Sequence, residues 1–164
     1  MKERHNNMAL DKVKEFFAGT ELDGKIVELN QSSATVDLAA AAIGCEADRI
    51  AKTLSFLIED KPLIIVVSGK SKIDNAKYRH KFETKAKMIP FDQVEELTGH
   101  APGGVCPFAL KPGIPVYLDE SRKKFDSVWP AAGSYNSCLN MTIAQLEKFS
   151  GFTEWVDVTK QMEE

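Results

Sequence analysis

Residues 52–68 read KTLSFLIEDKPLIIVVS, two apolar runs separated by a charged tripeptide. The runs at 52–58 and 62–68 predict two neighbouring strands, and Glu59-Asp60-Lys61 predicts the hairpin turn between them. The second run is continuously apolar from residue 63 to residue 67, a pattern typical of a central strand buried on both faces. This segment therefore predicts the middle of a β-sheet.

Shorter elements flank this hairpin on both sides. Apolar spacing and capping residues predict helices at 8–18, 36–43, 75–82, 91–98 and 144–149, and helical turns at 46–50 and 120–125. Further strands are predicted at 25–29, 85–89, 114–118, 127–131, 137–143 and 153–158. The pattern indicates one α+β domain with a mixed, curved sheet and helices packed around it. We expect an N-terminal helix within residues 1–19 and the main body of the domain over residues 20–164.

Length and composition fit a single globular domain. The chain has 164 residues, of which 43% are hydrophobic and 27% charged. No apolar run approaches the roughly 20 residues that a membrane span needs. The charged residues 1–7 precede no long apolar segment, so they do not resemble a secretory signal. We expect a cytoplasmic protein without a membrane partner.

Charge and cysteine usage exclude other classes. The formal net charge of −3 argues against a broad nucleic-acid-coating surface such as DNA binding requires. Basic residues do concentrate between 70 and 87, and such a run is either a solvated helical face or a patch that steers an RNA through its phosphates. The three cysteines are far apart with no C-x-x-C, and the histidines form no close pair, so we expect neither a metal site nor a cofactor.

The loop Gly103-Gly104-Val105-Cys106-Pro107-Phe108 is the clearest candidate for a functional segment. Adjacent glycines adopt backbone angles closed to other residues, and Pro107 stiffens the turn that follows. Such a loop either aims bare N–H groups of Gly103 and Gly104 at an oxygen or simply forms a tight turn. Lys52, at the start of an apolar strand, either holds a polar ligand group by its charge or lays its stem over apolar surface.

Four other polar or reactive residues have two readings each. Cys106 is either a nucleophile with His100 as its base or a small loop-packing residue. Thr98 and His100 either line the cleft or belong to the surrounding loop. Asn140 lies in a predicted half-buried strand, where its amide needs a backbone or ligand partner.

Several of these segments together resemble a known family. Residues 50–54 (IAKTL), Thr98-Gly99 followed by the loop 103–108, and residues 139–141 (LNM) follow the YbaK/EbsC pattern. That family includes the editing domain inserted in bacterial prolyl-tRNA synthetase and its free-standing relatives. The resemblance covers residues 20–160 and implies a barrel-like, curved sheet of the editing-domain type.

The resemblance implies trans-editing, the hydrolysis of the ester that joins a wrong amino acid to the 3′ end of a tRNA. Lys52 would hold the 3′-terminal nucleotide or its phosphate. The Gly103–Pro107 loop, with Val105 and Cys106, would shape the aminoacyl pocket, and water would be the nucleophile. The partners implied are a misacylated tRNA, tRNA(Pro) above all, and a synthetase such as prolyl-tRNA synthetase. Members specific for Cys-tRNA(Pro) carry an aspartate at the place of Asn140 and a small residue at the place of Cys106, which leaves the amino acid open.

Two alternatives remain beside the deacylase. The first is a binding module with the same pocket but no catalysis, since no conventional nucleophile–base pair is present. The second is a cysteine-dependent hydrolase that uses Cys106 and His100.

Overall fold

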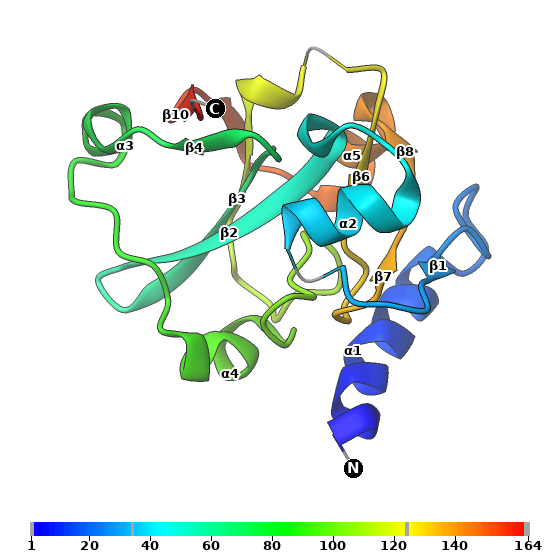
Figure 1. Cartoon of the computed structure of the whole chain (residues 1–164). Coiled ribbons are helices and arrows are strands. Elements are labelled where there is room, and N and C mark those ends of the chain that lie inside the picture. Colours follow the sequence, from blue (N-terminus) through cyan, green and yellow to red (C-terminus); the bar gives the residue numbers. More distant parts are fainter. Residues whose placement is uncertain (1, 34, 124, 163–164) are drawn as a thin grey trace.

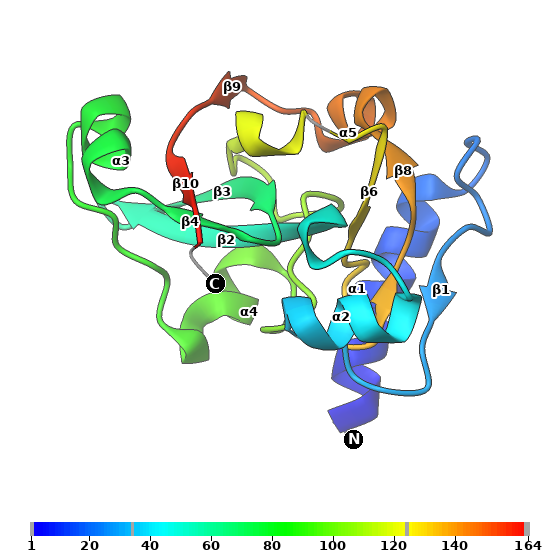
Figure 2. The same ribbon diagram turned by 45° about the horizontal axis from the view of Figure 1, so that its top comes forward.

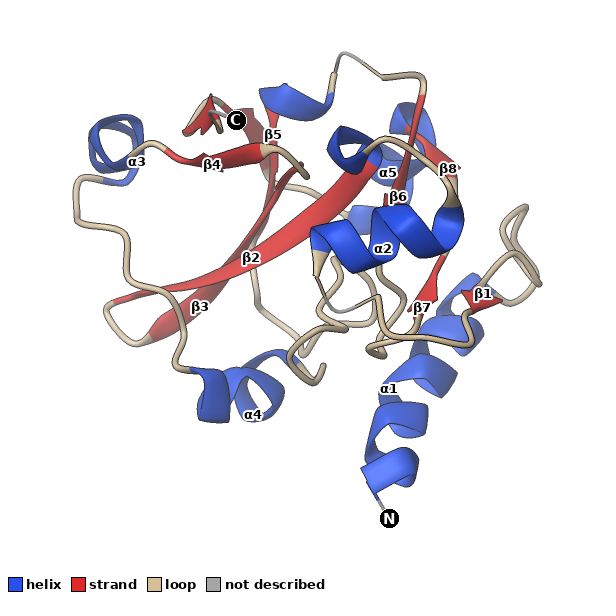
Figure 3. Cartoon of the chain, in the orientation of Figure 1, coloured by secondary structure: helices blue, strands red, loops and turns tan. Residues whose placement is uncertain are grey.

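The computed structural model describes residues 2–33, 35–123 and 125–162 and shows a curled six-stranded sheet. The strand order is β8-β6-β2-β3-β5-β9, with parallel and antiparallel neighbours, so the predicted mixed and curved sheet is confirmed (Figures 1 and 3). The strands are β2 (Ile50–Ile58), β3 (Lys61–Ser68), β5 (Val116–Asp119), β6 (Ser127–Pro130), β8 (Met141–Thr142) and β9 (Glu154–Val156).

The predicted hairpin forms the centre of this sheet. β2 and β3 pair antiparallel from Ala51 opposite Ser68 to Ile58 opposite Lys61. Glu59 and Asp60 take positive φ angles of 50° and 65° in the turn, which matches the twist of the flanking strands. The middle of β3, residues 64–67, is fully buried, because helices or loops cover both faces of this strand.

In the described part of the chain, five α-helices and three short 3₁₀ turns surround the sheet. The helices are α1 (Lys2–Phe17), α2 (Val36–Ile43), α3 (Asn75–Phe82), α4 (Val94–Thr98) and α5 (Ile143–Ser150); the turns are Ala47–Arg49, Phe91–Gln93 and Glu120–Arg122. Side-chain caps set three of the α-helix starts: Thr35 accepts from the amide of Leu38, Asp74 from the amides of Ala76 and Lys77, and Thr142 from the amide of Gln145. Lys124, in the predicted turn 120–125, lies outside the described residues.

Two of the strand predictions need correction, and two strands were missed. Residues 85–89 make only an isolated bridge between Met88 and Phe56, because Pro90 follows at once and donates no N–H. The predicted strand 137–143 is divided into β7 (Ser137–Cys138) and β8, and β7 pairs instead with β1 (Val27–Glu28). Two short strands, β4 (Ser71–Ile73) and β10 (Thr159–Gln161), are not predicted at all, and they form a separate antiparallel pair.

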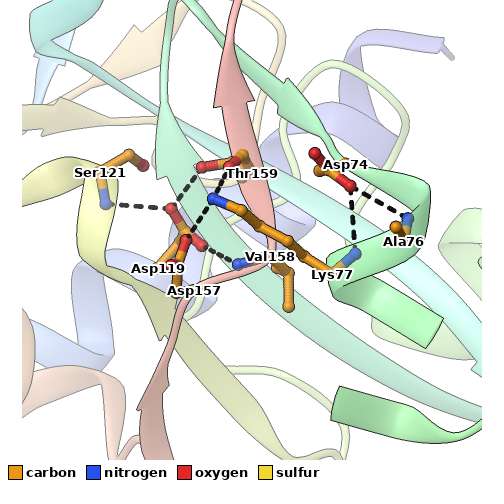
Figure 4. Close-up of polar contacts among 8 residues, drawn as sticks. All are labelled: Asp74, Ala76, Lys77, Asp119, Ser121, Asp157, Val158 and Thr159. Atoms are coloured by element: carbon orange, nitrogen blue, oxygen red, sulfur yellow. Dashed lines mark hydrogen bonds and ion pairs between the residues drawn. The ribbon is translucent and has the colours of Figure 1, made fainter. Parts of the chain in front are cut away.

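A buried carboxylate fixes β10 to the main sheet. Asp119, at the end of β5, is fully buried. It accepts hydrogen bonds from the amides of Ser121 and Val158 at 3.0 and 2.9 Å and from the Thr159 hydroxyl at 2.7 Å (Figure 4). Each partner offsets part of the cost of burying the charge. The polar anchor therefore positions the two-stranded β4–β10 sheet above β2 (Figure 2).

Candidate functional site

A cavity of about 400 Å³ lies between α2, the first half of β2 and the glycine loop. Its walls combine apolar groups with a few polar ones, as small-molecule sites do. The lining residues are Ser33, Thr35, Val36, Ala39, Ile50, Ala51, Lys52, Thr53, Leu54, Gly103, Val105, Trp129, Ala131, Ser137 and Cys138. The two segments that the sequence singled out, around Lys52 and Gly103, therefore meet at one cavity.

Lys52 supplies the positive charge of this cavity. Its side chain is half-buried, and its Nζ donates to the Ser71 carbonyl at 2.7 Å. Burial lowers the pKa of Lys52, and the nearby Asp48 carboxylate partly opposes that shift. An ammonium group with little water around it attracts an anionic group more strongly than an exposed lysine does.

The two glycines of the loop have different roles. Gly103 lines the cavity with φ +89°, and in the described part of the chain its amide N–H has no protein acceptor. Gly104 is buried, and its N–H donates to the Ala101 carbonyl at 3.0 Å. The expectation that both glycines offer free donors therefore does not fit Gly104, which has a structural role, while Gly103 is placed to act as a donor.

Gly104 lies against the turn at residues 133–134. Its carbonyl accepts from the Gly133 amide at 3.0 Å, and a Cβ on Gly104 would lie 2.6 Å from the Ser134 nitrogen. Only a residue without a side chain fits this contact. The glycine pair therefore reflects a close backbone approach at Gly104 and a positive φ at Gly103.

Four of the predicted site residues are buried and do not line the cavity: Thr98, His100, Cys106 and Pro107. The Thr98 hydroxyl donates to the Val94 carbonyl at 2.7 Å near the end of α4. His100 Nε2 lies 2.7 Å from the Phe108 carbonyl and 3.6 Å from Cys106 Sγ. Residues 98–108 fold back on α4, so the side chains of Thr98, His100 and Cys106 are buried in the protein. From this segment, only Gly103 and Val105 line the cavity.

Asn140 is exposed, which differs from the predicted half-buried strand position. It lies in the break between β7 and β8, and its amide nitrogen donates to the Ser127 hydroxyl and the Val128 carbonyl, each at 3.3 Å. It is absent from the cavity lining.

The wall of the cavity formed by α2 was not predicted from the sequence. Val36 and Ala39 show only an apolar helical pattern, which is also typical of core packing.

Burial makes Cys106 a poor nucleophile. It raises the pKa of the Cys106 thiol to about 12, and the side chain is fully buried. At pH 8 this leaves a thiolate fraction of about one in ten thousand.

We expect iodoacetamide to modify the partly exposed Cys45 in the native protein, and Cys106 only after denaturation, as measured by peptide mass spectrometry. Rapid native alkylation of Cys106 with loss of activity would revive the cysteine-hydrolase hypothesis.

Within the described residues, no group of three or more His, Cys, Asp or Glu side chains is arranged to hold a metal ion. No helix among them is long and apolar enough to cross a membrane. The cavity therefore offers a half-buried ammonium, the Gly103 N–H, several hydroxyl side chains and an apolar wall.

The curled mixed sheet with helices around it is the fold of YbaK-like editing proteins. The model of the aminoacyl-tRNA editing domain matches residues 30–149, and the chain belongs to this family. The uncharacterised protein YwhH of Bacillus subtilis (strain 168) is 45% identical over 157 residues, which cover 95% of this chain and 100% of YwhH.

A second relative and a solved structure agree with this assignment. The proline–tRNA ligase of Shouchella clausii (strain KSM-K16) is 31% identical over 86 residues, which are 52% of this chain and 15% of the ligase. A crystal structure described provisionally as a trans-editing enzyme for prolyl-tRNA synthetase superimposes with a TM-score of 0.82 and 30% identity, over 93% of this chain and 97% of that chain.

Proposed function

We propose that this protein is a trans-acting deacylase that hydrolyses misacylated tRNA, with tRNA(Pro) carrying a small wrong amino acid as the substrate class. One observation carries the proposal: the Lys52 side chain and the Gly103 backbone, about fifty residues apart in sequence, line the same cavity. Family membership supports the editing activity. The relation to proline–tRNA ligases and to the trans-editing crystal structure supports the choice of tRNA.

The proposed chemistry needs only positioning and charge stabilisation, because an aminoacyl ester is already reactive. Lys52 holds a phosphate of the 3′-terminal nucleotide, and the Gly103 amide donates to the ester oxygen that becomes negative. Water attacks the carbonyl carbon. The bond to the ribose oxygen then breaks, and that oxygen takes up a proton, so that a free amino acid and an intact tRNA 3′ end are released. A neighbouring ribose hydroxyl relays the proton.

Selection by size explains the need for such an enzyme. A synthetase pocket rejects an amino acid that is smaller by a methylene with only ~1–3 kcal/mol. A second pocket that admits small side chains and excludes larger ones accepts the smaller, wrong amino acid for hydrolysis and leaves the larger, correct one on its tRNA. Val105 and the apolar wall of α2 bound the cavity where the amino acid side chain would lie.

The decisive experiment incubates the purified protein with Ala-, Cys- and Ser-tRNA(Pro), and with correctly charged Pro-tRNA(Pro) as the control. We expect one or more of the small amino acids to be released many times faster than the spontaneous rate, while Pro-tRNA(Pro) persists. If the protein binds these tRNAs in fixed stoichiometry without turnover, the non-catalytic binding module is the better description. Equal hydrolysis of every charged tRNA would contradict the proposed selectivity.

A further inference from the structure

Basic residues between 70 and 87 occur in two different surroundings, on α3 and on the β4–β10 sheet. On α3, Lys77 Nζ lies 3.1 Å from an Asp157 carboxylate oxygen and donates to the Thr159 carbonyl at 2.9 Å (Figure 4). Lys81 Nζ lies 2.5 Å from a Glu154 carboxylate oxygen. The acidic C-terminal segment thus neutralises these two lysines, and this part of α3 is the solvated face that the charge run suggested.

The β4–β10 sheet carries two lysines, Lys72 and Lys160, whose like charges repel each other. The strand register places Lys72 directly opposite Lys160, and both side chains are exposed. Like charges in facing positions of a strand pair are unfavourable. No ion pair to either lysine occurs within the described ranges 2–33, 35–123 and 125–162. The Asp74 carboxylate interacts electrostatically with Lys160, and an anion bound across the pair would relieve the remaining repulsion.

β4 is held tightly against Lys52. The Ser71 carbonyl accepts from Lys52 Nζ at 2.7 Å, and the hydroxyls of Ser68 and Ser71 lie 2.7 Å apart. At Gly69, just before β4, a Cβ would lie 2.0 Å from the Ala47 carbonyl oxygen, so only glycine allows this approach. The backbone of Lys72, the next residue after Ser71, therefore has a fixed position relative to Lys52.

A second cavity continues from Lys52 toward this sheet. It has a volume of about 290 Å³, and Lys52 lines both cavities. Its other lining residues are Val36, Asp37, Ala47, Gly69, Lys70 and Met162, the last of which follows β10 directly. The amide of Met162 donates to the Lys70 carbonyl at 2.8 Å, which closes the end of the β4–β10 sheet beside this cavity. Lys52 and Lys70, together with the carboxylate of Asp37, thus line the space between the β4–β10 sheet and the first cavity.

We propose that the β4–β10 face binds the phosphodiester backbone of the single-stranded 3′ end of the substrate RNA. Lys72 and Lys160 contact phosphates, and the strand then passes the second cavity and delivers its terminal nucleotide to Lys52. Such contacts position an RNA strand without reading its sequence. The inference rests on the proposed function, because it takes the tRNA 3′ end as the ligand of the neighbouring cavity.

The test removes both charges together in the variant Lys72→Gln/Lys160→Gln. The matched control, Lys81→Gln/Lys148→Gln, removes two lysines that are already paired with Glu154 and Glu21. Binding of non-aminoacylated tRNA(Pro) is measured from 50 to 200 mM salt. We expect the slope of log K against log salt to fall by about 1.4 in the first variant, since each single-strand phosphate contact contributes ~0.7. We expect no change of slope in the control.

Kinetics separate a phosphate contact from a structural effect. With the misacylated tRNA as substrate, the first variant should raise KM and leave kcat unchanged. With 3′-aminoacyl-adenosine, which has no phosphate, it should match the wild type in both constants. An unchanged salt slope would overturn the proposal, as would a lower kcat on aminoacyl-adenosine. If the wild type hydrolyses no charged tRNA and the salt slope still falls as expected, the β4–β10 contact stands and only the deacylase proposal fails.

Discussion

Replacing Lys52 with methionine is expected to lower kcat/KM for the misacylated tRNA by about 100-fold. Methionine keeps a long unbranched side chain but removes the ammonium that lines the cavity. A hydrogen bond to a charged group contributes about 1.5–3 kcal/mol, and each ~1.4 kcal/mol corresponds to a factor of ten in rate. Single-turnover deacylation of the preferred substrate of the tRNA panel measures this loss. Lys61→Met is the matched control, because Lys61 is an exposed lysine at the far end of the same hairpin.

Stability distinguishes a lost charge from a misfolded variant. The pKa of Lys52 is lower in the folded protein than its ordinary value, because burial disfavours the charged form. Between the two pKa values the unfolded chain binds more protons, so this group makes the protein more stable as the pH rises through that window. The variant Lys52→Met removes a charge whose burial is unfavourable and also its hydrogen bond to the Ser71 carbonyl, so the two effects oppose each other and the free energy of unfolding should change by no more than about 1 kcal/mol. Full activity in a folded Lys52→Met protein would contradict the site assignment.

The elements that the sequence predicted well depend on local signals. The β2–β3 hairpin has a charged turn between apolar runs, and α2 and α3 begin at the capping residues Thr35 and Asp74. β4 and β10 were missed because each has three residues, and their pairing depends on the burial of Asp119 elsewhere in the chain. Such short polar strands carry no periodic pattern of their own.

The residues that line the cavity were predicted only in part, and the wrong predictions share one cause. The link between Lys52 and the glycine loop came from a family resemblance, and the structure brings both to one cavity. The sequence could not tell which side chains of the loop face that cavity. Because residues 98–108 fold back on α4, Thr98, His100 and Cys106 are buried, whereas Gly103 and Val105 line the cavity. Orientation within an irregular loop depends on tertiary contacts that no local pattern encodes.

The variant Gly104→Ala should both destabilise the protein and inactivate it. The added Cβ would lie 2.6 Å from the Ser134 nitrogen and 2.7 Å from the Gly133 carbonyl carbon. The turn at 133–134 has no room to withdraw, since a Cβ on Gly133 would itself lie 2.9 Å from the Ala9 backbone of α1. The loop must therefore move, and the free energy of unfolding should fall by about 3 kcal/mol. Chemical denaturation measures this change.

The loss of activity in Gly104→Ala follows from the displacement of its neighbour. Gly103 shares the loop, and a shift of about 1 Å at an oxyanion donor costs on the order of 100-fold in rate. Gly113→Ala is the control, because Gly113 also has a positive φ, +85°, but has open space around its missing Cβ. That variant should lose only about 1–2 kcal/mol from backbone strain and keep its deacylase activity. If Gly104→Ala were as active as Gly113→Ala, the position of the loop backbone would not control the reaction, and the Gly103 amide would lose its proposed role as the oxyanion donor.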